Sequence, residues 1–283
     1  MLRVSWLPLT IACALCAQEP APTPAASLKF TGAPMRVPVE CSQDDLRALG
    51  LICPAARPCP VYLELDTIDS AGSELFVSGN LHAEDATLSS ILLASDDGGT
   101  TWREPAERVR GAGLDLIQFA DAETGWASGE SLGAVPRDPF LLLTHDGGKT
   151  WESRPVFGES RTGTIDFFHF DSKTHGLLWI GRPLSGETGK HYETYESEDG
   201  GQTWNLREAS DKPFPKASLP APSGDYRLHA DRATRAYRVE RRAPAGWHSV
   251  ASFLVRAGEC REPELAPPPE PEPPPAAPGE AKP

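Results

Sequence analysis

One octapeptide decides the fold of this sequence, and it occurs as Ser95-Asp96-Asp97-Gly98-Gly99-Thr100-Thr101-Trp102, Thr144-His145-Asp146-Gly147-Gly148-Lys149-Thr150-Trp151 and Ser197-Glu198-Asp199-Gly200-Gly201-Gln202-Thr203-Trp204. Each copy fits the pattern Ser/Thr-x-Asp-x-Gly-x-Thr-Trp, and the tryptophans lie 49 and 53 residues apart. Repetition at such a period is typical of stacked copies of one supersecondary unit. The repeat therefore predicts an architecture before it indicates any chemistry.

The octapeptide has the composition of a tight β-hairpin turn. Asp-Gly between two β-rich runs is the strongest short-range hairpin signal. The aspartate can accept hydrogen bonds from backbone N–H groups of the turn, and the glycines supply positive φ. The threonine then restarts an extended strand, and the tryptophan buries its ring beside the turn. The residues expected to do this are Ser95, Asp97, Gly99, Thr101, Trp102, Thr144, Asp146, Gly148, Thr150, Trp151, Ser197, Asp199, Gly201, Thr203 and Trp204. Because these carboxylates close turns, they are poor candidates for acid–base catalysis.

The rest of each repeat follows the same rhythm. Gly79, Gly129 and Gly181 recur at 50 and 52 residues, so each unit is predicted as strand, turn, strand ending at glycine, loop, strand, octapeptide and strand. The octapeptide resembles the Asp-box (BNR) repeat found in blades of β-propellers. Combined with the segment 119–129, it resembles the photosystem II stability/assembly factor-like propellers. The resemblance spans residues 61–210.

A fourth unit follows without a complete octapeptide. Strands are expected at 226–230 and 236–241, the turn at 243–246 lacks the aspartate, and Trp247 lies 43 residues after Trp204. The sequence thus predicts an all-β fold, a small β-propeller of about four four-stranded antiparallel blades, preferably closed into a ring. The propeller is expected at 61–260, with blades at 61–110, 111–161, 162–212 and 213–256. Five blades, or an incomplete ring completed by dimerisation, are the alternatives.

Both ends of the chain differ in composition from the repeats. Residues 1–17 have one positive charge followed by a short apolar core, which predicts a signal peptide and an exported, periplasmic or extracellular protein. The alternative to a soluble exported protein is a lipoprotein with a lipid anchor at Cys13 or Cys16. Residues 18–27 form a Pro/Ala-rich linker, and 261–283 form a Pro/Glu-rich tail that is expected to be disordered. No other stretch is apolar and long enough to cross a bilayer.

The remaining cysteines indicate disulfides. The segment 28–60 and the end of the last unit contain Cys41, Cys53, Cys59 and Cys260, and four cysteines in an exported chain allow three pairings. Cys53 and Cys59 bracket a short loop and are the natural local pair, which would leave Cys41 to reach Cys260. Metal binding or free thiols are less compatible with export.

The charge is acidic and uneven. The formal net charge is −13, whereas residues 225–260 contain seven arginines against four acids, a net charge of +3. This segment is interpreted either as solvated strand faces or as a basic patch for an acidic partner. An exported acidic chain of this kind is not expected to bind nucleic acid.

Sequence patterns for catalysis and metal binding are weak. The string 129–133 matches Gly-x-Ser-x-Gly, but a nucleophile elbow requires a following helix, and here a loop containing Pro136 follows. The histidines show no His-x-His or His-Glu-x-x-His spacing, so neither a metal nor a cofactor is predicted.

The leading functional hypothesis is an exported, non-catalytic propeller that acts as a binding or assembly scaffold for a protein partner in the cell envelope. The resemblance implies a family that assists the assembly of membrane-protein complexes. The alternative is a sialidase-like Asp-box glycoside hydrolase, which needs an arginine cluster, a tyrosine nucleophile and an acid. Weak binding candidates are the loop residues Arg137, Asp138, Arg182 and Lys190. The oligomeric state is not predicted.

Overall fold

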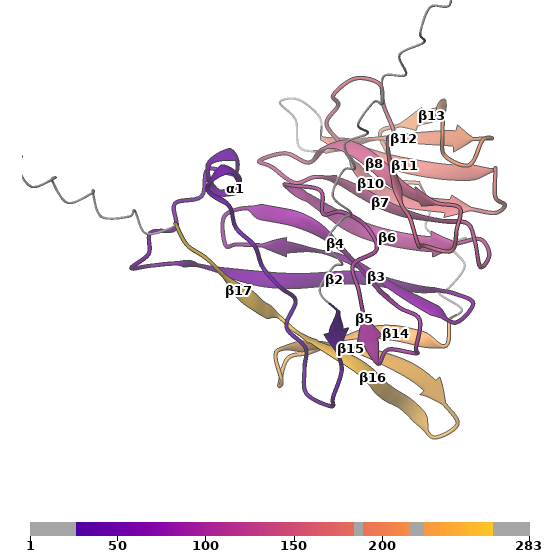
Figure 1. Cartoon of the computed structure of the whole chain (residues 1–283). Helices are drawn as coiled ribbons and strands as arrows, with labels where there is room; N and C mark the ends of the chain where they lie inside the picture. Colours follow the sequence, from indigo (N-terminus) through magenta and orange to yellow (C-terminus); the bar gives the residue numbers. More distant parts are fainter. Residues whose placement is uncertain (1–26, 184–188, 215–223, 263–283) are drawn as a thin grey trace, which may run out of the picture.

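The computed structural model describes residues 27–183, 189–214 and 224–262, and it consists almost entirely of antiparallel β-strands (Figure 1). The predicted signal peptide, Cys13, Cys16, and nearly all of the linker and the C-terminal tail lie outside the described residues. Within the described ranges, no helix combines the length and the apolar character needed to cross a membrane.

Two sheets have the four strands that the repeat predicts. The second sheet contains β6 (Ala112–Phe119), β7 (Gly125–Ser131), β8 (Arg137–Thr144) and β9 (Glu152–Pro155), hydrogen-bonded in that order. The third sheet contains β10 (Thr164–Phe170), β11 (Gly176–Pro183), β12 (Lys190–Ser197) and β13 (Asn205–Ser210) in the same order. Each sheet is therefore a simple antiparallel meander formed by one repeat.

The first sheet obtains its fourth strand from the other end of the chain. Its order is β17–β2–β3–β4, formed by β2 (Cys59–Ala71), β3 (Glu74–His82), β4 (Thr87–Ser95) and β17 (Arg256–Cys260). The strand after the first octapeptide, β5 (Thr101–Trp102), has two residues and pairs with β1 (Leu28–Lys29). Pro105 follows closely, and a proline cannot donate to a strand ladder, so this strand stops early.

The fourth sheet has three strands, β14 (Tyr226–Asp231), β15 (Ala236–Ala243) and β16 (Gly246–Leu254). The turn between β15 and β16 lies at the expected 243–246, although the octapeptide is absent there. Asp231 instead closes the turn between β14 and β15 by accepting from Ala233 N and Thr234 N.

The three octapeptides form the predicted hairpin turns. In the second copy, Asp146 Oδ1 accepts from the backbone N–H groups of Lys149 and Thr150 at 3.0 and 2.9 Å, and Asp146 Oδ2 accepts from Thr150 Oγ1 at 2.6 Å. Partial burial acts to raise the pKa of Asp146, but these hydrogen bonds outweigh it and lower the pKa to about 2. The same bonds to the threonine N–H and hydroxyl recur at Asp97 and Asp199, whose pKa values are also lowered.

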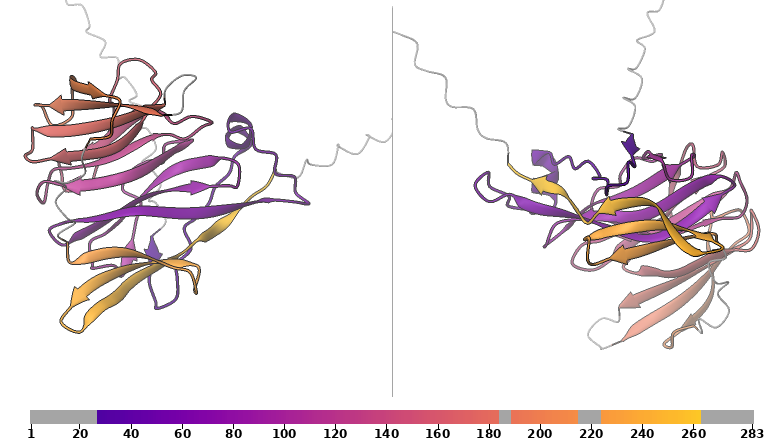
Figure 2. Two further views of the ribbon diagram at one scale, coloured as in Figure 1. Left: turned by 180° about the vertical axis from the view of Figure 1, so that it is seen from behind. Right: turned by 90° about the horizontal axis from the view of Figure 1, so that it is seen from below.

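The sheets lie side by side in the order fourth, first, second, third (Figures 1 and 2). β14 packs against β2, β6 packs against β2, β3 and β4, and β10 packs against β6, β7 and β8. The third and fourth sheets therefore lie at opposite ends of the arrangement, with the other two between them. The all-β fold of about four antiparallel, propeller-like sheets is confirmed. The preferred closed ring is corrected to the incomplete ring, because the last sheet packs on the first instead of joining the third.

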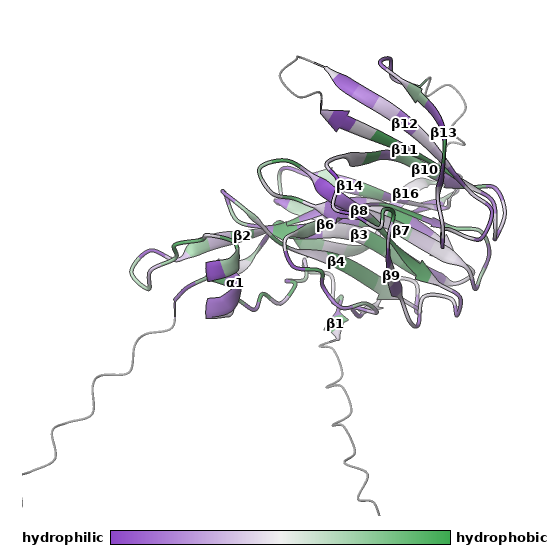
Figure 3. Ribbon diagram, turned by 90° about the horizontal axis from the view of Figure 1, so that it is seen from above, coloured by the Kyte–Doolittle hydropathy of each residue, from purple (hydrophilic) through white to green (hydrophobic). Residues whose placement is uncertain are grey.

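The core fills the spaces between neighbouring sheets. The space between the fourth and first sheets is filled around Trp102 and Phe253, whose ring centroids lie 5.2 Å apart in an edge-on arrangement. Phe76 and Leu114 fill the second space, and Trp126 fills the third, where its Nε1 donates to Gly200 O at 2.8 Å. Hydrophobic residues accordingly concentrate on strands such as β4 and β8, whereas much of β12 is hydrophilic (Figure 3).

Two disulfides hold the N-terminal segment. Cys53 is bonded to Cys59 across the predicted short loop, and Cys41 is bonded to Cys260 in β17, with Cα–Cα distances of 5.2 and 5.5 Å. This is the pairing that the sequence favoured. The one helix in the described part of the chain, α1 (Gln43–Ala48), begins just after Cys41 and is capped at its N-terminus by Ser42. Disulfides are typical of proteins in an oxidising compartment.

Candidate functional site

The first strands of three sheets carry an aspartate at the same position. Asp66 in β2, Asp115 in β6 and Asp166 in β10 lie 49 and 51 residues apart, in step with the octapeptides. In each sheet the pairing with the next strand skips this aspartate, so each one occupies a β-bulge. Bulges are frequent next to functional sites because they redirect a side chain. The repeat therefore builds a carboxylate into a bulge three times.

The recurring glycines are explained by these bulges. A Cβ on Gly79 would collide with the backbone of Glu64 and Leu65, and a Cβ on Gly129 would collide with the carbonyl oxygen of Gly113. A Cβ on Gly181 would meet the carboxylate of Asp166. Only glycine lets the first strand approach so closely at these three positions.

Two glutamates extend the three aspartates into a larger group. Glu64 lies two residues before Asp66 in β2, and Glu130 lies in β7, directly after Gly129. We call Glu64, Asp66, Asp115, Glu130 and Asp166 the carboxylate cluster. Glu130 is 4% exposed, and within the part of the chain that the structure describes its Oε2 atom has no hydrogen-bond partner. A buried acceptor of this kind is costly and favours a ligand that donates to it.

Crowding raises the pKa values within the cluster. Burial, followed by the neighbouring Asp115, raises the pKa of Glu130 to about 8. Desolvation by the surrounding protein, followed by the charges of Glu64 and Asp115, raises the pKa of Asp66 to about 7, although its side chain remains open to solvent. Desolvation also raises the pKa of Asp115. The cluster therefore holds protons at neutral pH that a bound cation would displace.

The four loop candidates from the sequence gather beside this cluster. Lys190 Nζ lies 3.4 Å from Asp166 Oδ1, and Arg182 Nε donates to Thr162 O at 3.2 Å. Asp138 Oδ1 accepts from the backbone N–H of Arg161 at 2.9 Å, and the backbone of Arg137 forms an isolated antiparallel β-bridge with that of Thr162. All four thus contact the segment 161–166, which ends in the bulge of β10. Residues 184–188 of the loop that contains Arg182 and Lys190 lie outside the described residues. A role of the four residues in binding stays a prediction.

A second polar group contains the residue types of a sialidase site. Tyr195 Oη donates to Glu193 Oε2 at 2.6 Å, Arg161 Nη1 donates to Tyr195 Oη at 3.2 Å, and Arg182 Nη1 donates to Glu193 Oε1 at 3.0 Å. However, Tyr195 is 4% exposed, and burial together with Glu193 raises its pKa to about 12. A tyrosine nucleophile needs to be reachable and readily ionised, so this group is better suited to packing than to catalysis.

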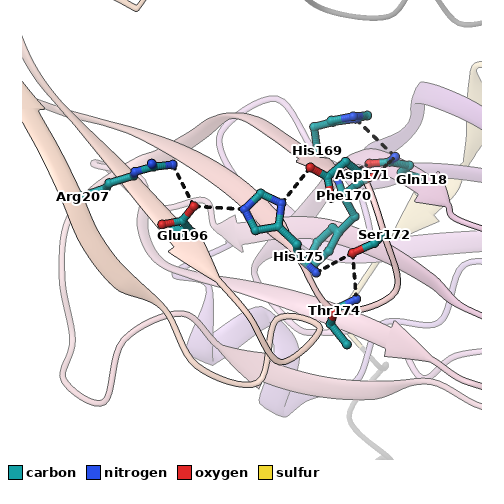
Figure 4. Close-up of polar contacts among 9 residues, drawn as sticks. All are labelled: Gln118, His169, Phe170, Asp171, Ser172, Thr174, His175, Glu196 and Arg207. Atoms are coloured by element: carbon teal, nitrogen blue, oxygen red, sulfur yellow. Dashed lines mark hydrogen bonds and ion pairs between the residues drawn. The ribbon is translucent and has the colours of Figure 1, made fainter.

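A third polar group surrounds His175 at the turn after β10 (Figure 4). Its Nδ1 lies 2.7 Å from Asp171 Oδ2, and its Nε2 lies 3.0 Å from Glu196 Oε1, to which Arg207 Nη1 also donates at 2.7 Å. The hydrogen bond to Glu196, followed by that to Asp171, raises the pKa of His175. His175, Glu196 and Glu198 each place one potential metal-ligand atom within 4.8 Å of the other two. The histidine spacing in the sequence did not predict this group. Both ring nitrogens of His175 and the Oε1 atom of Glu196 are thus already hydrogen-bonded within the group.

Sequence reasoning missed the carboxylate cluster. Glu130 falls in the Gly-x-Ser-x-Gly string that lacks the following helix, and the expectations from the sequence assign no role to the three aspartates. A signal did exist, because Asp115 and Asp166 are single acidic residues between apolar neighbours at the repeat period. What the sequence could not supply was the approach of Glu130 to Asp115 from an adjacent strand.

Several solved structures resemble this chain at low sequence identity. No protein-family model matches the chain, and no curated protein matches it. YCF48 bound to a D1 peptide is 18% identical, with a TM-score of 0.36 over 70% of this chain and 60% of that chain. An α-L-arabinanase of Penicillium chrysogenum complexed with arabinobiose is 15% identical, with a TM-score of 0.35 over 66% and 58%. This chain spans less than two thirds of the length of either structure, and its function has to be inferred from its own residues.

Proposed function

We propose that this protein is an exported, non-catalytic scaffold that binds a protein partner of the cell envelope, and that the partner places a cationic group in the carboxylate cluster. The observation that carries the proposal is Glu130: its carboxyl group is buried beside Asp115, to which it bonds when one of the two is protonated, and its Oε2 has no donor among the described residues. A lysine, an arginine or a terminal amine would donate to this oxygen and neutralise the surrounding acids.

The surroundings of the carboxylate cluster favour the binding of a cationic side chain from a protein partner. Asp66 and Glu64 remain exposed, so the cluster has an open side through which a side chain can enter. Lys190 beside Asp166 is itself an ammonium in contact with the cluster and shows the geometry that a partner's lysine would adopt. Binding energy would come from charge-assisted hydrogen bonds in partly desolvated surroundings.

The two disulfides support export, since such bonds persist in oxidising compartments, and they agree with the leader predicted at residues 1–17. A partner in the same compartment would be a secreted protein or the exported part of a membrane protein.

One observation favours the glycoside hydrolase alternative. With a pKa of about 8, Glu130 stays protonated at neutral pH, as a general acid must. A glycosidase also needs a second carboxylate that stays ionised beside the acid. The pKa values of Asp66 and Asp115 are raised together with that of Glu130, so neither of these two forms with Glu130 the divergent pair that assigns acid and base roles.

The proposal can be tested with a fluorescent trilysine peptide and the mature, oxidised protein. Fluorescence anisotropy should show binding that strengthens from pH 6 to pH 9 as Glu130 ionises, and that weakens about tenfold in Glu130→Gln. The exposed Glu123→Gln, in the same sheet, is the matched control and should bind normally. A panel of chromogenic glycosides should show no turnover.

Two results would overturn the proposal. Equal binding by wild type and Glu130→Gln would remove the cluster as the site. Turnover of a glycoside that Glu130→Gln abolishes would assign the cluster to the hydrolase alternative.

A further inference from the structure

The two end sheets of the arc each have a face that no other sheet covers within the described residues. The fourth sheet packs Val239, Ala251 and Phe253 against the first sheet, and the third sheet packs Leu178 and Ile180 against the second. The opposite face of each end sheet points away from the other sheets (Figures 1 and 2). In a closed propeller, each sheet is flanked on both faces.

The uncovered face of the fourth sheet is basic. On the side opposite Val239, strand alternation places Arg227, Arg238 and Arg242 with the two acids Glu240 and Asp231, which gives a net charge of +1. The guanidinium carbons of Arg227 and Arg242 lie 4.4 and 5.2 Å from the centre of the Trp247 ring, so the ring lies against both. The two acids are already engaged, Glu240 by Arg227 and Asp231 by Arg238. Tryptophan and arginine are the residues most often found at the energetic centre of protein interfaces.

The uncovered face of the third sheet is acidic and aromatic. Its acids are Glu196 and Glu208, which share the side of Trp179 through the pairing of β11, β12 and β13, whereas Glu193 pairs with Ile180 on the covered side. Glu208 pairs with Thr194, and Thr194 with Trp179, so these residues share one face. On the same face, the ring centroids of Trp179 and Phe167 lie 4.5 Å apart. The two ends of the arc therefore carry opposite charges, and each offers a tryptophan.

We propose that a second copy of this chain completes the ring, with the basic face of each copy on the acidic face of the other. Two arcs of four sheets give eight, which is the upper end of the usual range for propellers. A two-fold axis through the ring centre would form both contacts at once, so the assembly closes at two chains and does not extend into a filament. This inference does not depend on the carboxylate cluster.

Sedimentation equilibrium of the mature, oxidised protein tests the inference. At low salt we expect the mass of two chains, and a dissociation constant that rises about tenfold or more at high salt, where charges are screened. Arg242→Glu on one face and Glu208→Arg on the other should each give single chains. An equimolar mixture of these two variants should recover the mass of two chains, because one contact keeps its native charges and the other has both charges reversed.

Two variants control for folding and for general charge effects. Arg47→Glu alters an exposed arginine on α1, away from both faces, and should leave the mass at two chains. Trp247→Ala should weaken association without any change in charge. A mass of one chain for the wild type, or of two chains for both charge-reversal variants, would overturn the inference.

Discussion

Glu130→Gln should stabilise the protein, and increasingly so as the pH rises from 5 to 8. Burial raises the pKa of Glu130 from 4.5 to about 8, so the folded state holds a proton that the unfolded state has released. A raised carboxyl pKa contributes stability below pH 4.5, and that stability is lost as the pH rises toward the folded pKa. Glutamine has nearly the same shape and cannot ionise, so it removes this loss.

The magnitude follows from the two pKa values. One pKa unit corresponds to about 1.4 kcal/mol, so a group with these values loses roughly 2–3 kcal/mol of stability between pH 5 and pH 7. The loss is complete just above pH 8, at roughly 4–5 kcal/mol. The free energy of unfolding of Glu130→Gln should therefore exceed that of the wild type by about 1 kcal/mol at pH 5 and by about 3 kcal/mol at pH 7.

Urea unfolding at pH 5, 6, 7 and 8, followed by tryptophan fluorescence, measures these differences. Glu123→Gln should run parallel to the wild type, because its side chain is 73% exposed. A Glu130→Gln curve that is also parallel to the wild type would show that Glu130 ionises normally. A variant less stable than the wild type at every pH would show that the glutamate makes bonds that the structure does not contain.

Three further predictions concern the turns, the bulges and the disulfides. Asp97→Ala removes the acceptor for Thr100 N, Thr101 N and Thr101 Oγ1 and should lower the free energy of unfolding by about 1–2 kcal/mol in urea titrations, whereas the adjacent, exposed Asp96→Ala should change it little. Gly181→Ala pushes a methyl group into the Asp166 carboxylate and should lower the thermal unfolding midpoint, whereas Gly133→Ala, which meets open space, should not; equal midpoints would contradict the tight approach at the bulge. Replacing Cys41 and Cys260 by serine opens a link across 219 residues and should cost about 5 kcal/mol, against about 2 kcal/mol for Cys53 and Cys59, which are 6 residues apart; a larger loss from the short link would argue against the loop-entropy account.

Local signals in this sequence predicted local structure well. The octapeptide contains its own turn-closing bonds, so its hairpins need no information from elsewhere in the chain. Asp97, Asp146 and Asp199 each accept from a threonine four residues later in the chain. The fourth unit lacks the aspartate, yet its turn at 243–246 was also placed correctly from the strands on either side of it.

Contacts between distant segments were not predictable in the same way. Whether the ring closes depends on which sheet the last unit packs against, and Phe253 meets Trp102 of the first repeat instead of residues of the third. The pairing of β5 with β1 and the use of β17 in the first sheet also join chain segments more than 70 residues apart. No periodicity within one repeat encodes such choices.

Two classes of carboxylate with opposite effects on stability are built into the first two repeat units. Asp146 and its equivalents have lowered pKa values, so they stabilise the folded state above pH 4 and lose that effect as the pH falls toward about 2. Glu130 and Asp66 have raised pKa values, so their ionisation destabilises the folded state as the pH rises toward about 8 and about 7. In the second sheet the two classes lie at opposite ends of the strands, since Gly125 pairs with Thr144 beside the octapeptide, whereas Glu130 adjoins the far end of β7. The turn that holds the sheet together is thus separate from the acids that weaken it, and this separation allows the crowded carboxylates to persist in a folded sheet.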